Sequence, residues 1–240
     1  GLTASVFVVD SAAMSQGKPL LPSDFPDDLP AGLTPKRWLS QSARGDVLEV
    51  SKDSRPMVLR LGGRLALGEV ALAARVRSPG LVAPDSWGTT DAGRAWVLRP
   101  FVEGPTWDEA ARGVDPVGDA ASETPGKPAS DAASDTGVDP ATLESWALAV
   151  LETLADLHGA GLVHRDVKGA NVIISAQGPV LIDLDLLIES GDDDEGAGTP
   201  RHMAPEVLLG QPATPASDLF ALGAMLALST GAAPSPRFHR

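Results

Sequence analysis

The residue types that most often carry out chemistry gather in one short stretch of the chain, residues 164–171, with the sequence HRDVKGAN. Asp166 offers a carboxylate that can act as a base, Lys168 a compact cation, and Asn171 an amide oxygen that can bind a metal ion. The stretch is flanked by aliphatic segments, which are expected to be buried. The pattern therefore predicts a rigid loop that presents several polar groups to a ligand.

A further carboxylate, Asp183, lies near the end of the second of two short apolar runs that follow, 171–175 and 179–185. If these runs pair as a hairpin, Asn171 and Asp183 lie near one another. Both side chains offer the oxygen ligands that Mg²⁺ prefers, and phosphate oxygens would complete the coordination. Because phosphoryl transfer requires a base, a cation and a metal ion at the phosphates, the pattern points to that chemistry.

A helix is predicted directly before the polar loop, over residues 140–159. Asp139 and Pro140 are typical of an N-cap and a first helical turn, and Gly159 is typical of a helix end. Apolar residues line one face of this helix: Leu143, Ala147, Leu151, Leu154 and Leu157. A second apolar helix is predicted over residues 217–230.

The first half of the chain is dominated by short β-type runs that are separated by small or polar residues. A twisted antiparallel sheet fits this half, with one helix over residues 65–80 that ends at Ser-Pro-Gly. The predicted strands cover residues 37–41, 46–51, 55–63, 81–87 and 94–102.

Residues 1–36 are expected to form a leader segment, in which the apolar run 2–10 is interpreted as a strand. Two segments lack any helical or strand period. The first is residues 11–36, which contain many Pro, Asp and Gly residues. Residues 113–138 are nearly all small, acidic, Pro or Gly, so we expect a disordered acidic insertion there.

Composition excludes several classes of protein. The 19 basic and 32 acidic residues give a net charge of −13, which argues against nucleic-acid binding and favours basic partners. The absence of cysteine excludes a disulfide scaffold and thiolate chemistry. The apolar run 2–10 is too short for a signal peptide or a membrane span. We therefore expect a cytoplasmic protein without a membrane segment.

Four motifs occur in a fixed order in the second half of the chain: HRDVKGAN (164–171), DLD (183–185), GTPRHMAPE (198–206) and SDLFALGAMLALSTG (217–231). With these motifs the chain resembles the eukaryotic-type (Hanks-type) protein kinase family, in its Ser/Thr branch and bacterial style. The resemblance implies an α+β fold with a β-rich N-lobe at residues 37–102 and a mainly helical C-lobe at 103–240. The chain stops before the family's last helices, so two interpretations stay open. The C-lobe is reduced in size, or the chain is an incomplete fragment.

The resemblance also implies roles for individual residues, with ATP as the phosphate donor and a protein hydroxyl as the acceptor. Asp166 would take or orient the proton of the hydroxyl, Lys168 would steady the γ-phosphate, and Asn171 and Asp183 would hold Mg²⁺. The nucleotide-binding positions that it implies are Gly45, Val47, Val58, Arg60, Glu69, Phe101, Val102, Asn171, Ile173 and Asp183.

Other positions would support the catalytic loop or the activation segment. His164, Glu206 and Asp218 are expected to be buried structural residues, and Arg165 could pair with a phosphorylated activation segment. The acidic run 192–195 is interpreted either as a solvated loop or as a docking site for a basic substrate.

The N-terminal half departs from the family's pattern. Arg60 stands where the family has its ATP-anchoring lysine, and Glu69 is the expected ion-pair partner of this residue. A planar guanidinium does not place a point charge on the phosphates as an ammonium does. Ser40 and Ser42 replace the first two glycines of the loop that covers the phosphates, so only Gly45 remains.

Two further departures are Asp185, in place of the glycine of Asp-Phe-Gly, and Arg99, at the normally apolar back of the adenine pocket. Two functions therefore stay open. The first is an ATP- and Mg²⁺-dependent serine/threonine protein kinase. The second is a pseudokinase that serves as a nucleotide-sensing or scaffolding module without phosphotransfer. The sequence does not indicate the oligomeric state.

Overall fold

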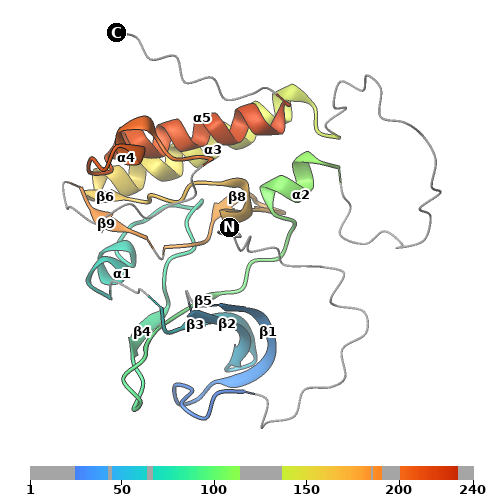
Figure 1. The fold of residues 1–240 in the computed structure, drawn as a ribbon. Helices are drawn as coiled ribbons and strands as arrows, with labels where there is room; N and C mark the ends of the chain where they lie inside the picture. The colour runs from blue at the N-terminus through green and yellow to red at the C-terminus, as the bar shows by residue number, and fades with distance from the viewer. Residues whose placement is uncertain are drawn as a thin grey trace, which may run out of the picture.

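The computed structural model describes residues 25–42, 45–63, 67–113, 137–184, 186–190 and 201–231. These residues form a β-sheet lobe, at the bottom of Figure 1, and a mainly helical lobe above it. The two-lobed α+β fold expected from the sequence is therefore confirmed. In the described part of the chain, no helix is long and apolar enough to cross a membrane.

The lower lobe is an antiparallel sheet of five strands in the order β1-β2-β3-β5-β4. Its strands are β1 (Thr34–Ser42), β2 (Gly45–Lys52), β3 (Arg55–Leu61), β4 (Ser86–Thr89) and β5 (Ala95–Pro100). The side chains of β3 alternate between the two faces of the sheet. Met57 and Leu59 are buried in the core of this lobe, whereas Val58 and Arg60 face a cleft on the other side.

The expected leader, residues 1–36, ends earlier than the sequence suggested. Strand β1 begins at Thr34, and Phe25, Leu29 and Leu33 pack against the core of the sheet. The ring of Phe25 stacks on that of Trp38, with 6.1 Å between the centroids. Residues 25–33 therefore belong with the sheet, because their isolated apolar side chains cover its core. Residues 1–24 lie outside the described residues.

An ion pair fastens this early segment to the sheet. Arg94 bonds through Nε to Asp28 Oδ2 at 2.8 Å and through its terminal nitrogens to Asp28 Oδ1 and Asp46, while Thr90 donates to Asp28 at 2.9 Å. These contacts, with the hydrogen bond from Arg94 first, lower the pKa of the Asp28 carboxyl to about 2.

We expect this pair to contribute stability that depends on pH. Since the pKa of Asp28 is lower in the folded chain, its contribution is complete above the ordinary value of 3.8 and is lost as the pH falls toward about 2. Urea unfolding of the parent and of Arg94→Gln at pH 5 and pH 3 measures it. The stability difference between the two proteins should shrink at the lower pH; a constant difference would contradict the assignment.

The helix expected over residues 65–80 is much shorter in the structure. Helix α1 spans Leu67–Ala73 and is followed by turns rather than by further helix. Val76 and Leu81 are buried in the core of the helical lobe together with Ala73. The segment after the helix therefore packs into the same core as turns and extended chain.

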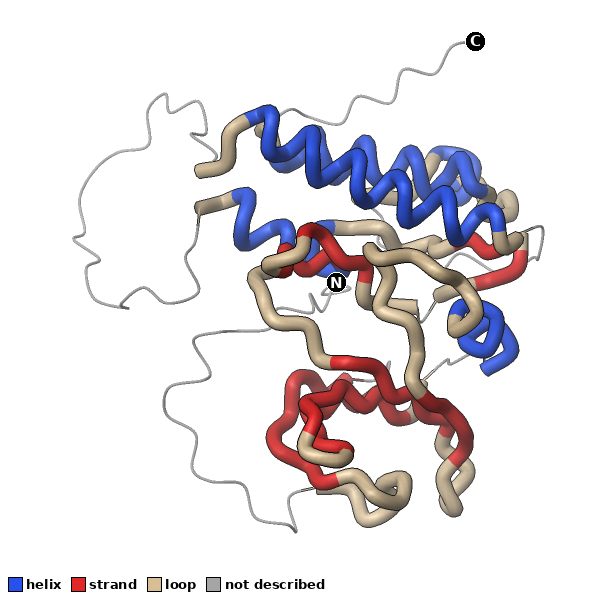
Figure 2. The backbone as a smooth tube through the Cα atoms, turned by 180° about the vertical axis from the view of Figure 1, so that it is seen from behind, coloured by secondary structure: helices blue, strands red, loops and turns tan. Residues whose placement is uncertain are grey.

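The upper lobe is built on two long helices that lie side by side, as Figure 2 shows from behind. Its helices are α2 (Trp107–Ala111), α3 (Pro140–Gly159), α4 (Pro205–Leu208) and α5 (Pro215–Ser229). The expected N-cap of α3 is confirmed, since the Asp139 carboxylate accepts from the backbone N–H groups of Ala141 and Thr142 at 3.0 Å. The short helices α2 and α4 were not predicted from the sequence.

The prediction is wrong for one residue on the expected buried face of α3. Leu151 is 40% exposed, whereas Val150 is 1% exposed and takes its place in the core. The buried positions follow the alternating spacing of three and four residues that a helix of 3.6 residues per turn requires. Leu151 continues a spacing of four that drifts off this face.

Two small strand pairs frame the polar loop. Strands β7 (Val172–Ser175) and β8 (Gly178–Leu181) form an antiparallel hairpin, which confirms the pairing expected from the sequence. Strand β6 (Leu162–Val163), just before the loop, pairs with β9 (Ile188–Glu189). The loop is thus held by strand pairing on both sides.

Most of the expected acidic insertion, residues 114–136, lies outside the described residues, as do residues 43–44, 64–66, 191–200 and 232–240. Its two ends are described. A Cβ atom on Gly113 would lie 3.2 Å from the Cα of Gly137, so the chain leaves and re-enters the helical lobe at one place.

Candidate active site

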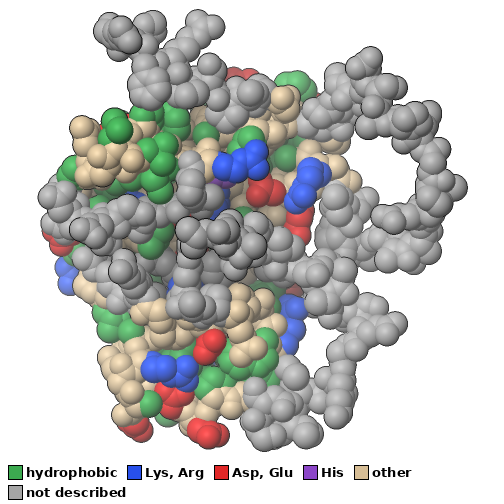
Figure 3. Space-filling model, in the orientation of Figure 1, with side chains coloured by type: hydrophobic (Ala, Val, Ile, Leu, Met, Phe, Trp, Pro, Cys, Tyr) green, Lys and Arg blue, Asp and Glu red, His purple; other side chains and the backbone are tan. Residues whose placement is uncertain are grey.

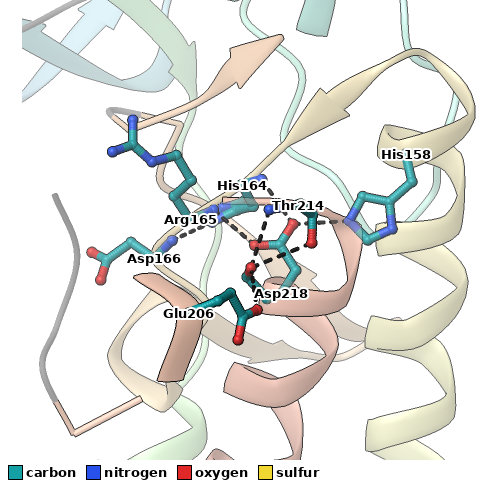
Figure 4. A network of polar contacts seen from close by, with 8 residues as sticks. His158, His164, Arg165, Asp166, Glu206, Thr214 and Asp218 are labelled. Carbon is teal, nitrogen blue, oxygen red and sulfur yellow. Dashed lines mark hydrogen bonds and ion pairs between the residues drawn. The ribbon is translucent and has the colours of Figure 1, made fainter. Parts of the chain in front are cut away.

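The polar loop is anchored from below by a buried carboxylate on α5. Asp218, 1% exposed, accepts from the backbone N–H groups of His164 and Arg165, both at 2.8 Å. His158, on α3, approaches the same carboxylate at 2.8 Å. Figure 4 shows Asp218 at the centre of this network. Because Arg165 has a φ of +70°, a conformation that costs a non-glycine residue energy, these bonds hold a backbone that would not form by itself.

The network continues to the end of the GTPRHMAPE motif. Ser217 donates to Glu206 at 2.8 Å, and the backbone N–H of Thr214 donates to Ser217 at 3.0 Å. Figure 4 shows Glu206 beside the first turn of the helix that carries Asp218. The start of α5 therefore positions both the catalytic loop and the motif that ends at Glu206.

The loop's functional side chains form a compact buried group. Lys168 Nζ lies 2.5 Å from Asp166 Oδ2, and Asn171 Nδ2 lies 3.1 Å from the same oxygen and 2.9 Å from the backbone carbonyl of Asp166. All three residues are at most 8% exposed. Figure 4 shows the Asp166 side chain turned away from Asp218. This arrangement fixes the carboxylate between a cation and an amide.

The hairpin brings Asn171 and Asp183 to the same cleft, as the sequence predicted. The backbone N–H of Ile182 donates to the carbonyl of Asn171 at 3.0 Å, which fastens the chain just before Asp183. Because Asn171 uses its Nδ2 atom toward Asp166, its Oδ1 atom is left as a possible ligand. Amide and carboxylate oxygens suit Mg²⁺, so these two residues fit the ion that the sequence implies.

The described residues contain no group of three or more His, Cys, Asp or Glu side chains that could hold a metal ion. A cation at Asn171 and Asp183 would therefore complete its coordination with oxygens from a bound phosphate ligand or from water.

The cleft lies between the sheet and the helical lobe and is largely apolar. It contains six of the predicted nucleotide-binding residues: Val47, Val58, Arg60, Asn171, Ile173 and Asp183. It also contains residues that the sequence did not single out as binding positions: Leu39, Val70, Val82, Pro84, Val97, Thr106, Ala170, Ile182 and Leu184. A cleft lined by aliphatic side chains from both lobes is suited to the rings of a base.

Thr106 is a missed residue that the sequence could have revealed. The pattern Thr-x-x-Glu at residues 106–109 is a capping box, and the structure forms it, with Glu109 accepting from the N–H of Thr106 at 2.7 Å. The capped helix α2 begins at the edge of the cleft because Thr106 also bridges to Ile173 of β7.

The two arginines enter the cleft from neighbouring strands. Arg60, 7% exposed, lies opposite Val97 on β5, and Arg99 lies opposite Val58 on β3. Both arginines line the cleft, so the side of the cleft that the sheet forms carries two positive charges. The side chain of Glu69 lies outside the described residues, and its ion pair with Arg60 stays a prediction.

Three other predicted binding residues, Gly45, Phe101 and Val102, are not among the residues that line the cleft. For Gly45 the structure provides another reason for glycine. Its φ is +121°, and a Cβ atom there would lie 2.8 Å from the carbonyl oxygen of Gly62. The close approach of the two backbones requires a residue without a side chain. Asp185 lies outside the described residues.

Residues 125–239 match the family model described as the protein kinase domain. Over 98 residues the chain is 42% identical to the probable serine/threonine-protein kinase PkwA of Thermomonospora curvata. The aligned residues make up 38% of this chain and 13% of that protein. Over 115 residues the chain is 40% identical to the serine/threonine-protein kinase AfsK of Streptomyces coelicolor. This alignment covers 44% of this chain and 14% of that protein. The chain thus spans a small part of the length of these relatives.

The fold is similar to that of solved kinase structures. The kinase domain of PknI from Mycobacterium tuberculosis superposes with a TM-score of 0.61 and 23% identity, over 90% of this chain and 80% of that chain. The kinase PK-1 of the Cydia pomonella granulovirus gives a TM-score of 0.64 and 16% identity, over 83% of this chain and 69% of that chain. At these identities the similarity speaks for the fold alone.

Proposed function

We propose that the chain is a Hanks-type protein kinase, in the Ser/Thr branch of bacterial style, and that it transfers the γ-phosphate of ATP to a serine or threonine hydroxyl of a protein; the match of residues 125–239 to the protein kinase domain supports this proposal. The observation that carries this proposal is the buried group in which Lys168 and Asn171 both contact the Asp166 carboxylate, beside a cleft that contains Asp183.

In this proposal Asp166 accepts a hydrogen bond from the substrate hydroxyl and takes its proton as the oxygen attacks phosphorus. Lys168, held at 2.5 Å from Asp166, contacts the γ-phosphate and stabilises the charge that develops there. Asn171 Oδ1 and Asp183 would hold Mg²⁺, which neutralises phosphate charge when it is bound.

The nucleotide would occupy the cleft with its base between the valines of the sheet and Ile173. Arg60 would contact the phosphates in place of the usual lysine, with two or more N–H groups rather than a single ammonium. Its location on the central strand and its burial support this role. The donor is proposed to be ATP and the compartment to be the cytoplasm.

A second candidate is a pseudokinase that binds nucleotide without transfer. The observation that favours it is the pair of arginines, Arg60 and Arg99, on one side of the cleft. A guanidinium at residue 60 differs in size and charge distribution from an ammonium, so the phosphates could be bound but badly aligned for attack.

Labelled ATP, Mg²⁺ and a generic basic protein substrate distinguish the two functions when the parent is compared with Arg60→Lys. We expect transfer by the parent, because the base and the metal-binding residues are all present. No transfer by the parent, together with transfer by Arg60→Lys, would establish the pseudokinase instead. In either case ATP with Mg²⁺ should stabilise the folded chain, by about 2.7 kcal/mol at a concentration of 100 Kd, as measured by thermal unfolding.

A further inference from the structure

Strand β1 carries a bulge at the edge of the nucleotide cleft. In the pairing of β1 with β2 the register shifts between Trp38 and Ser40, so the two strands do not match residue for residue there. Trp38 packs against the core of the sheet lobe, whereas the next two residues, Leu39 and Ser40, both line the cleft. A regular strand would turn consecutive side chains to opposite faces. The bulge therefore directs the Ser40 side chain to the cleft.

Ser40 lies in the same row of the sheet as Arg60. Ser40 of β1 is opposite Val47 of β2, and Val47 is opposite Arg60 of β3. All three residues line the cleft. Opposite residues of an antiparallel pair have Cα atoms about 4.5–5.5 Å apart, so the backbones of Ser40 and Arg60 are separated by about 10 Å. A phosphate group fits between these two side chains, above the short side chain of Val47.

The hydroxyl of Ser40 is the donor that β1 offers to a ligand in the cleft. The described residues of β1 that line the cleft are Leu39 and Ser40, and of these two only the serine has a side-chain hydrogen-bond donor. Among the described residues, no hydrogen bond uses this hydroxyl. It is thus available to an acceptor that enters the cleft, such as a phosphate oxygen.

Other cations of the first two strands are paired with carboxylates outside the cleft. Arg37 Nε lies 2.6 Å from Glu49 Oε2, and Lys52 Nζ lies 2.6 Å from Asp85 Oδ2. Figure 3 shows basic and acidic side chains together on the visible face of the sheet lobe, at the bottom of the picture. Neither Arg37 nor Lys52 is among the residues that line the cleft. Phosphate binding from the sheet therefore depends on the donors inside the cleft.

The glycine that remains in this part of the chain serves the packing of the sheet. Gly45 is required by the close approach of its backbone to Gly62, and it is not among the residues that line the cleft. A loop that binds phosphates through its backbone N–H groups uses glycines because the backbone itself must approach the ligand. At residue 40 this chain has a side chain with a hydroxyl instead.

We propose that the Ser40 hydroxyl binds the phosphates of the nucleotide, together with Arg60, in place of the backbone contacts of a glycine-rich loop. This inference rests on the proposed kinase function, in which ATP occupies the cleft. The hydroxyl donates to one phosphate oxygen, and the guanidinium donates through two or more N–H groups. The pairing of β1, β2 and β3 fixes the places of both side chains.

Isothermal titration calorimetry of the whole chain with ATP, ADP and adenosine, each with Mg²⁺, tests this proposal. We expect Ser40→Ala to bind ATP and ADP about tenfold more weakly than the parent, as for the loss of a hydrogen bond to a charged group. Adenosine has no phosphate, so the parent and Ser40→Ala should bind it equally. A role of Ser40 in the fold alone would weaken the binding of all three ligands.

The decisive variant is Ser40→Gly. If the chain held the phosphates through its backbone at this place, glycine would bind ATP at least as tightly as serine does. We expect instead the same loss as in Ser40→Ala. The control is Ser51→Ala on β2, which removes a hydroxyl from the same sheet at a residue that is not among those lining the cleft, and which should bind ATP as the parent does. Thermal unfolding verifies that each variant is folded.

The proposal is overturned if Ser40→Ala or Ser40→Gly binds ATP as tightly as the parent, or if Ser40→Ala loses as much affinity for adenosine as for ATP. Phosphate transfer to a generic basic protein is measured in parallel. Weaker ATP binding by both variants, without any transfer by the parent, would refute the kinase function and leave this inference standing. Equal ATP binding by the parent and the variants, with transfer by the parent, would refute this inference and leave the kinase function standing.

Discussion

Replacing Asp166 with asparagine should lower the rate of phosphate transfer by about 10³-fold, within the range that a general base contributes. Asparagine has nearly the same shape and can still place an oxygen near Lys168 and Asn171, but it cannot take the proton of the hydroxyl. The variant should therefore fold and bind ATP as the parent does, which thermal unfolding with and without ATP and Mg²⁺ would measure.

The matched control is Asp156→Asn, which neutralises an exposed carboxylate on α3. We expect it to transfer phosphate at the parent's rate. If Asp166→Asn retained more than about a tenth of the parent's rate, well above the residual rate expected on loss of a general base, the carboxylate would not be the base.

The second large effect is expected for Asp218→Ala. This change removes the acceptor of two buried backbone N–H groups and leaves His158 without its carboxylate partner. At about 1–3 kcal/mol for each buried donor left unsatisfied, the free energy of unfolding should fall by roughly 3 kcal/mol or more. Urea unfolding of Asp218→Ala and of Asp156→Ala provides the measurement and its control.

Activity should fall as well in the Asp218→Ala molecules that remain folded. The backbone at Arg165 has a φ of +70°, and its N–H bond to Asp218 helps to keep it in that conformation. Without that bond, the backbone next to Asp166 would lose its fixed conformation, and the carboxylate its fixed place beside Lys168 and Asn171. A variant as stable as the parent, within about 0.5 kcal/mol, would show that the network of Figure 4 does not hold the loop.

The part of the candidate site that could be predicted is the part that is local in sequence. Asp166, Lys168 and Asn171 are separated by only a few residues, and the helix before them and the hairpin after them have strong signals in the chain. The hairpin pairing then required Asn171 and Asp183 to be close, and the structure confirms this.

The errors have a common physical cause. The exchange of Leu151 for Val150 depends on which side of α3 packs against the rest of the lobe. Residues 25–33 contain too few apolar side chains to show a pattern, yet Phe25 and Leu29 cover the core of the sheet. Burial of this kind is decided by partners that are distant along the chain.

The sequence by itself therefore predicted the two-lobed fold, which the structure confirms, and the residues that make up the polar loop, because motifs and periodicity are properties of neighbouring residues. Only the tertiary structure decided that Asp218 binds the loop's backbone from 53 and 54 residues away, and that Asp108 lies against Gly169. Contacts between such distant residues arise from the packing of α2 and α5 on the loop, which no local pattern encodes.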